Sequence, residues 1–236
     1  MRYKVREFDG GLPDLIFLHR RKQSNMPKHH LIISGTGRAG TTFLVQLLTE
    51  LGLDTGFPHA NSGIHESSNA GMEWNIKHHN APYVVKNPAL CKDLEEVLEA
   101  GEVVVDRAII PIRDLFASAE SRRTVQRKVN KRDTPGGLIL TSNPSDQEAV
   151  LAVQLHSLVH ALAKHDVPMI WLYFPRLVKD PDYLYDKLKS VLPGQNAETF
   201  SQAFRAVSRP ELVHDFKPES APKPTLLTGL KTWLRP

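Results

Sequence analysis

The segment "GTGRAGTTFL", Gly35–Leu44, decides the fold of this chain. It follows the apolar run "HLIIS" and opens the amphipathic run "TTFLVQLLTEL", which predicts a strand, a glycine-rich turn and a helix in succession. In such a unit, consecutive backbone N–H groups and the helix N-terminus surround an anion, most often a phosphate. The nucleotide-hydrolase pattern GxxxxGK(S/T) has a lysine where this chain has Thr41. The segment therefore predicts an anion-binding loop without the lysine that those enzymes use on the β- and γ-phosphates.

Length and composition indicate one globular domain. The chain has 236 residues, of which 41% are hydrophobic and 24% are charged, as in ordinary globular proteins. We expect a single domain, 1–236, with a peripheral arm at 1–30, a core at 31–209 and an extended tail at 210–236. Because no run of 18 apolar residues predicts a membrane span and no leader pattern is recognisable, we expect a cytoplasmic protein.

Cysteine content and charge narrow the class further. The single cysteine, Cys91, excludes a disulfide within the chain and a zinc site made of four cysteines. The net charge of +4 suits anionic small substrates as well as nucleic acid. Since the basic residues are not interleaved with aromatic ones and no nucleic-acid fold motif is present, we expect no nucleic-acid partner. His156 and His160 stand at i, i+4 without an evident third ligand, so we expect no metal site.

Short apolar runs alternate with helical patterns along the chain. This alternation predicts a three-layer α/β/α fold with a mainly parallel sheet, and the glycine-rich segment predicts a P-loop after its first strand. A long irregular stretch at 54–80 is expected to carry function. The strands are expected at 31–34, 83–86, 107–112 and 167–174, and the helices at 41–52, 90–101, 114–129, 147–165, 183–194 and 197–209, with Asp146 as the cap of the fourth helix.

Three basic or polar side chains are expected beside the loop. Arg113 stands at the end of the third expected strand, and Ser121 follows eight residues later in a helix. Because ligands gather at the carboxyl ends of parallel strands, both can reach the crevice of the loop. Lys86 ends the second expected strand and can neutralise an anion there, although a solvated lysine is the common alternative. The basic run at 122–132 is interpreted as a solvated helix face.

Taken together, five segments resemble the sulfotransferases that use 3′-phosphoadenosine 5′-phosphosulfate (PAPS), over about residues 31–194. The resemblance is to the bacterial-type members, and it lies in the order of the segments as much as in each one. In chain order the segments are "GTGRAGTTFLVQLLTELGLDTG", "NAGMEW", "VVKNPAL", "IIPIRDLFASAESRR" and "LYFPRLVKDPDYLYDKLKSVLPG". The chain departs from the family at "FPRL", where an acidic residue is usual, and its only counterpart of a late R-K-G run is "GLKTW" at 229–233.

The resemblance implies a P-loop fold of the sulfotransferase and nucleoside-kinase type, a cofactor, an activity and a set of residues. It implies PAPS as sulfuryl donor, its product adenosine 3′,5′-bisphosphate (PAP), and metal-independent in-line transfer to a hydroxyl or amine. Arg113 and Ser121 would hold the 3′-phosphate. The 5′-phosphosulfate would be held by Arg38, Ala39, Gly40, Thr41 and Thr42.

A general base must also take the proton of the acceptor. The resemblance narrows it to the stretch after the first helix, where Glu73 and His65 are favoured over His59 and Glu66. Glu73 belongs to the segment that best matches the family, and histidine titrates near neutral pH. Lys86 is expected to offset negative charge that develops on the transferred group.

Two other readings of the sequence remain open. A small-molecule kinase would require ATP and magnesium, and the missing lysine counts against it. A non-catalytic nucleotide-binding module would use Arg113 and Ser121 but not Lys86, Glu73 or His65. The acceptor is expected to be a small molecule or a carbohydrate, and the sequence leaves a homo-oligomer open.

Overall fold

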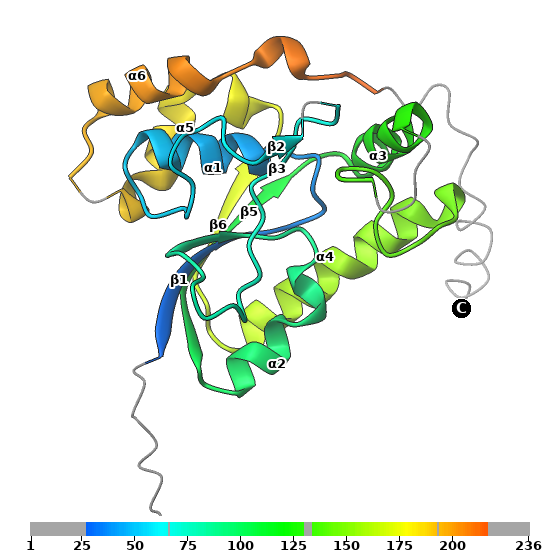
Figure 1. Ribbon diagram of the computed structural model, residues 1–236, viewed down its shortest axis with the longest axis horizontal. Helices are drawn as coiled ribbons and strands as arrows, with labels where there is room; N and C mark the ends of the chain where they lie inside the picture. Colours follow the sequence, from blue (N-terminus) through cyan, green and yellow to red (C-terminus); the bar gives the residue numbers. More distant parts are fainter. Residues whose placement is uncertain (1–26, 66, 130–133, 193, 217–236) are drawn as a thin grey trace, which may run out of the picture.

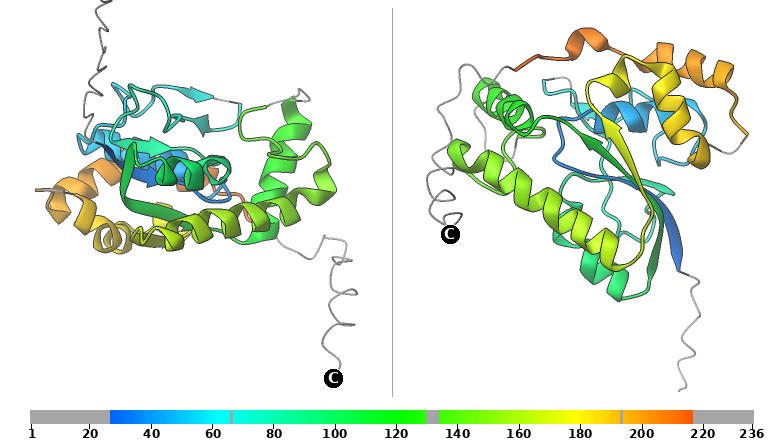
Figure 2. Two further views of the ribbon diagram at one scale, coloured as in Figure 1. Left: turned by 90° about the horizontal axis from the view of Figure 1, so that it is seen from below. Right: turned by 180° about the vertical axis from the view of Figure 1, so that it is seen from behind.

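A parallel sheet of four strands forms the centre of the molecule. The computed structural model describes residues 27–65, 67–129, 134–192 and 194–216. The strand order is β4-β1-β5-β6, and every pairing within this sheet is parallel. A second, two-stranded antiparallel sheet, β2–β3, stands out from the first (Figure 2). The strands are β1 (Lys28–Ile33), β2 (Ile64–His65), β3 (Ala70–Gly71), β4 (Val84–Lys86), β5 (Val103–Ile112) and β6 (Met169–Tyr173).

Helices cover both faces of the sheet and confirm the three-layer α/β/α architecture. One face packs against α1, α5 and α6, and the other packs against α2 and α4 (Figure 1). Helix α3 follows β5 and packs on α4. The helices are α1 (Thr41–Glu50), α2 (Leu94–Glu99), α3 (Leu115–Val129), α4 (Gln147–Lys164), α5 (Pro181–Leu188) and α6 (Ala197–Val207). Short 3₁₀ turns are η1 (Leu90–Lys92), η2 (Pro144–Asp146), η3 (Arg176–Val178), η4 (Lys189–Val191) and η5 (Pro210–Leu212).

The sheet has a hydrophobic core on each face, because successive side chains of a strand point to opposite faces. In β1, Leu31 and Ile33 face α1, whereas Ile32 faces α4, and all three are fully buried. Such uninterrupted apolar strands are characteristic of a parallel sheet that is covered on both faces. On the α1 side, the ring of Phe200 is fully buried between the rings of Tyr185 and Phe204, at centroid distances of 5.3 and 6.5 Å. This aromatic group fixes α6 to the rest of the molecule.

The starts of β1 and β5 differ from the expected ones, and the expected cap of α4 makes a different contact. β1 begins at Lys28, inside the expected arm, and β5 begins at Val103 rather than at 107. These two strands pair along the additional residues, so main-chain hydrogen bonds to a central strand extend β1 through the polar sequence "KHH". Asp146 does occupy the N-cap position of α4, but its carboxylate caps no N–H group; it accepts a hydrogen bond from the Asn143 side chain instead.

The order of the strands positions the site. After β1 the chain forms β4 on one side of β1 and then crosses to form β5 on the other side. The connections that follow β1 and β5 therefore diverge, which creates a topological switch point at their carboxyl ends. The loop after β1 and Arg113 after β5 both lie at this edge of the sheet. In the part of the chain that the structure describes, no helix is long and apolar enough to cross a membrane.

Candidate functional site

The loop between β1 and α1 offers a row of free backbone donors. We call residues 34–40 the glycine-rich loop. From Gly35 to Thr42, no backbone N–H group has a hydrogen-bond acceptor within the described ranges, although Thr36 and Ala39 are buried. Buried N–H groups are almost always paired in native proteins. The loop is therefore arranged to receive acceptor atoms from a ligand.

The start of α1 is consistent with this arrangement. Its N-cap, Gly40, supplies no side-chain hydrogen bond, and the first turn of α1 contains no acidic residue. In contrast, α5 and α6 are capped by the side chains of Asp180 and Asn196. A bound anion would satisfy the free N–H groups of α1 and interact favourably with the helix dipole.

Arg38 lies at the centre of the site. Its Nε donates to Ser121 Oγ at 3.0 Å, and its Nη1 donates to the carbonyl oxygen of Ser68 at 2.7 Å. Burial, together with the nearby charge of Arg113, lowers the pKa of Arg38 to about 10, so its side chain remains charged at neutral pH. The structure thus joins two residues, Arg38 and Ser121, that are 83 positions apart in the sequence.

Arg113 reaches the loop from the end of β5. Its Nη1 donates to the carbonyl oxygen of Arg38 at 2.8 Å, and its Nη2 donates to the carbonyl oxygen of His214 at 2.6 Å. Its guanidinium also lies over the ring of Phe174, 4.8 Å from the ring centroid. Burial lowers the pKa of Arg113. A guanidinium has five N–H donors, so donors remain for a ligand.

Lys86 is buried rather than solvated. Only 1% of its surface is exposed, and its Nζ donates to the carbonyl oxygen of Gly71 at 2.8 Å and to Glu73 Oε1 at 2.9 Å. Burial lowers the pKa of Lys86, and the carboxylate of Glu73 opposes this effect. The Glu73 side chain itself is 46% exposed. The pair places one buried cation and one accessible carboxylate side by side.

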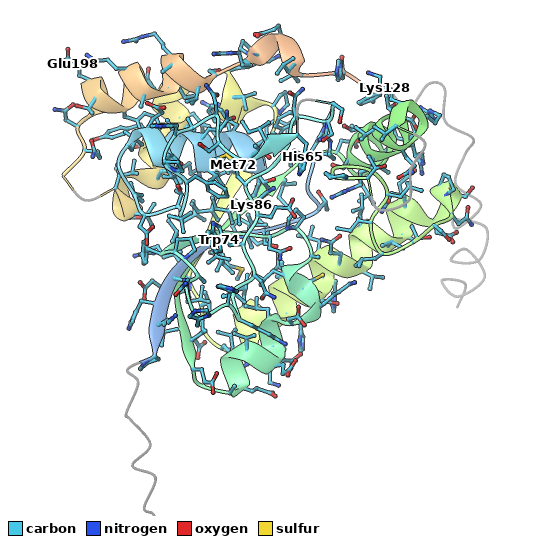
Figure 3. All side chains as sticks on the ribbon, viewed as in Figure 1. His65, Met72, Trp74, Lys86, Lys128 and Glu198 are labelled. Carbon is cyan, nitrogen blue, oxygen red and sulfur yellow. The ribbon has the colours of Figure 1, made fainter. Side chains whose placement is uncertain are left out.

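The β2–β3 hairpin covers the glycine-rich loop and is held by the side chains of Arg38 and Lys86. Arg38 binds the carbonyl oxygen of Ser68, and Lys86 binds that of Gly71. Figure 3 shows His65, at the end of β2, and Met72, directly after β3, close to Lys86 in this view. Both residues line the cavity beneath the hairpin.

Replacement of Gly71 by alanine is expected to destabilise this hairpin. Gly71 has a φ of 127°, and an added Cβ would lie 2.1 Å from the carbonyl oxygen of Gly63, the residue before β2. We expect a loss of about 1–3 kcal/mol, to be measured by thermal unfolding. Gly52→Ala is the control, because Gly52 has a φ of 80° but no atom within 4 Å of an added Cβ. An equal loss in both variants would contradict a steric cause.

The glycine-rich loop, the β2–β3 hairpin and the side chains that contact them enclose a cavity of about 840 Å³. A volume of this size suits a nucleotide or a drug-sized ligand. Among the described residues that line it, Glu73 is the only carboxylate, whereas the basic residues are five: Arg38, Lys86, Arg113, Arg122 and Arg209. The cavity is therefore an electropositive site, and its composition favours an anionic ligand.

The expected site residues can now be placed. Glu73, His65, Lys86, Arg113 and Ser121 all line the cavity. From the glycine-rich loop and the start of α1, the cavity lining includes Arg38, Gly40, Thr41 and Thr42. Within the described ranges, neither the Thr41 nor the Thr42 hydroxyl has a hydrogen-bond partner.

Three candidate residues and one candidate segment stand apart from that group. The side chain of Ala39 is fully buried outside the lining, so Ala39 can contribute only its backbone N–H group. His59 is exposed and does not line the cavity. Glu66 and the "GLKTW" segment lie outside the described residues.

Three residues of the cavity are not predicted from the sequence. Arg122 is buried, so its interpretation as part of a solvated helix face is wrong. The sequence feature that could have identified Arg122 is its position directly after Ser121, at the N-terminal end of the basic run. Arg209 and His214 reach the cavity from the segment after α6, and no sequence pattern connected that segment with the loop.

The chain matches no protein-family model and no curated protein. The function is therefore inferred from the residues and the geometry of the site.

Proposed function

We propose that this protein is a sulfotransferase that moves a sulfuryl group from PAPS to a hydroxyl or amine of a small-molecule or carbohydrate acceptor. The observation that carries this proposal is the row of free N–H groups from Gly35 to Thr42. Five residues of this row line an electropositive cavity together with Arg113: Gly37, Arg38, Gly40, Thr41 and Thr42. Such a row suits the oxygen atoms of a phosphate or phosphosulfate group. The resemblance of the five sequence segments supplies the choice of sulfuryl transfer.

The residues present fit a nucleotide with phosphate groups at both ends of one ribose. By resemblance, Arg38 serves the 5′-phosphosulfate and Ser121 serves the 3′-phosphate. The 3.0 Å hydrogen bond between them means that the two subsites are adjacent, as the two groups are in PAPS. The free N–H groups and the hydroxyls of Thr41 and Thr42 can then hold the oxygen atoms at the 5′ end. Arg113 adds positive charge at the 3′ end.

When bound, PAPS would supply an activated sulfuryl group, whose bond to the phosphate breaks as a bond to the acceptor oxygen or nitrogen forms. Lys86 is placed to offset charge on the oxygens during this exchange, because its Nζ is buried beside the glycine-rich loop. Preorganised donors of this kind act strongly in a site that excludes water. Lys86 is therefore assigned to charge stabilisation.

The acceptor proton has two candidate receivers. Glu73 and His65 both line the cavity, and the proton would move from the acceptor to one of them as the new bond forms. Glu73 is held by Lys86, which fixes its position. His65 is exposed at the end of the hairpin, and within the described ranges its ring has no hydrogen-bond partner. Both residues remain candidates for the base.

Calorimetric titration with PAP in the presence of EDTA tests the proposal. We expect binding in the micromolar range to the unmodified protein, and roughly tenfold to hundredfold weaker binding to Arg113→Ala. The reason is that a hydrogen bond to a charged group contributes about 1.5–3 kcal/mol. Arg176→Ala is the matched control, because Arg176 is exposed, pairs with Asp180 and lies outside the cavity lining.

One specific observation favours a kinase as the second candidate. Lys86 and Glu73 bring a cation and a carboxylate to the glycine-rich loop from another part of the chain, as an ATP–magnesium site would require. The same titration separates the two functions. Binding of ATP with magnesium, without binding of PAP in EDTA, would contradict sulfuryl transfer and support the kinase.

A further inference from the structure

Arg122 is a buried cation with no carboxylate partner. It follows Ser121 on α3, and only 3% of its surface is exposed. Its Nη2 and Nε both donate to the carbonyl oxygen of Thr36, at 2.8 and 3.3 Å, and its Nη1 donates to that of Gly137 at 2.8 Å. In the described part of the chain, no carboxylate lies within ion-pair distance of it. A charge buried in this way is costly unless a ligand compensates it.

The contact with Thr36 determines the direction of a loop donor. The Thr36–Gly37 peptide is trans and planar, so its carbonyl oxygen and the N–H group of Gly37 point in opposite directions. Because Arg122 holds the carbonyl oxygen, the N–H group of Gly37 is turned away from Arg122. Gly37 lines the cavity, and this N–H group has no acceptor within the described ranges.

Glycine at position 37 makes this contact possible. Gly37 has a φ of 67°, and an added Cβ would lie 2.3 Å from Nη2 of Arg122. The guanidinium therefore lies directly against the loop backbone, where a larger residue would displace it.

The neighbouring carbonyl groups of the loop are held in the same way. The Gln154 side chain on α4 donates to the carbonyl oxygen of Gly35 at 3.1 Å and also binds that of Pro88. Arg113 holds the carbonyl oxygen of Arg38. Three side chains from distant segments thus fix three of the four carbonyl groups from Gly35 to Arg38, and with them the N–H groups of the following residues.

We propose that Arg122 and Gln154 are positioning residues, which preorganise the N–H groups of the glycine-rich loop for an anion by fixing the carbonyl groups of Thr36 and Gly35. Arg122 additionally supplies positive charge that the anion compensates. The identity of the physiological anion rests on the proposed function, whereas the positioning of the loop by Arg122 and Gln154 does not. Binding benefits because the loop does not have to be ordered when the ligand arrives.

The test compares Arg122→Gln, Arg122→Lys and Gln154→Met with the unmodified protein, with pyrophosphate and PAP as separate probes. Affinity is measured by calorimetry, and the free protein is checked by thermal unfolding. For both probes we expect roughly tenfold to hundredfold weaker binding to Arg122→Gln, since a charge and its hydrogen bonds are lost. Arg122→Lys should bind more tightly than Arg122→Gln, because it retains the charge. Gln154→Met should weaken binding by a smaller factor than Arg122→Gln does, because it removes a neutral donor.

Arg127→Gln is the matched control, because Arg127 is on the same helix, 64% exposed and paired with Glu120. It should leave the affinity for both probes unchanged. A purely structural role for Arg122 predicts a lower unfolding temperature in Arg122→Gln with unchanged affinities, and that result would overturn the proposal. If Arg122→Gln does not fold, unchanged affinity in Gln154→Met overturns it instead.

The two probes separate this inference from the proposed function. If pyrophosphate binds through Arg122 but PAP binds no more tightly than pyrophosphate, the sulfotransferase proposal fails and the positioning role stands. If PAP binds tightly and none of the Arg122 and Gln154 variants weakens it, the positioning role fails and the sulfotransferase proposal stands. If neither probe binds to the unmodified protein, both are overturned.

Discussion

Replacement of Lys86 by methionine is expected to reduce the rate of sulfuryl transfer by about 10²–10³-fold, which is the cost of removing one preorganised donor from a site where charge develops. Methionine has a similar length but carries no charge, so it keeps the packing of a side chain that is 1% exposed. The measurement is the release of PAP from PAPS with an acceptor found by screening. The variant also removes the hydrogen bond to the carbonyl oxygen of Gly71 and leaves the Glu73 carboxylate without its partner, so thermal unfolding must show that the fold persists before the rates are compared.

Lys92→Met is the control for this experiment. Lys92 is exposed at the end of η1 and lies outside the cavity lining, so its replacement should leave the rate unchanged. A Lys86→Met variant that is fully active would show that charge stabilisation is provided elsewhere in the cavity. A non-catalytic nucleotide-binding module would bind PAP and release none from PAPS in either variant.

The largest effect on stability is expected from Phe200→Ala. A fully buried phenylalanine replaced by alanine costs about 3–5 kcal/mol, because apolar contacts are lost and a cavity remains. For a chain of this size, that loss lowers the unfolding temperature by on the order of 10 °C. Thermal unfolding followed by circular dichroism measures it.

Gln202→Ala on the same helix is the control, because Gln202 is exposed and its truncation removes no core contact. Phe200 also anchors the helix that leads to Arg209 and His214. Phe200→Ala should therefore weaken PAP binding at temperatures at which the fold persists. A loss below about 1 kcal/mol would show that α6 contributes little to the core.

The sequence predicts the fold well because each strand in the main sheet contains an apolar run and the helices between these runs have an amphipathic period. The segment Gly35–Leu44, together with the apolar run before it and the amphipathic run that it opens, predicts the succession of β1, the loop and α1. The starts of β1 and β5 are not predictable in this way. Lys28 becomes part of a strand only because Val103 pairs with it, and such pairing depends on tertiary structure rather than on local preference.

The site is predicted where topology constrains it. Arg113 follows a strand and Ser121 lies two helical turns later, so their convergence on the loop follows from the rule for parallel sheets. Arg122 belongs to a run of basic residues whose members look alike in sequence, and packing against the loop distinguishes it from Arg127. Arg209 reaches the cavity through the path of the chain after α6, which no local pattern reveals.

The hydrogen bonds that shape the glycine-rich loop have a consequence for the order of folding. Arg113, Arg122 and Gln154 follow their partners in the loop by 75, 86 and 119 positions. Contacts this distant in sequence slow folding, because the intervening chain must be ordered before they form. As the chain leaves the ribosome, the loop emerges long before these three residues. A nascent chain that has not yet reached residue 154 carries the loop sequence without the interactions that give the loop its binding shape.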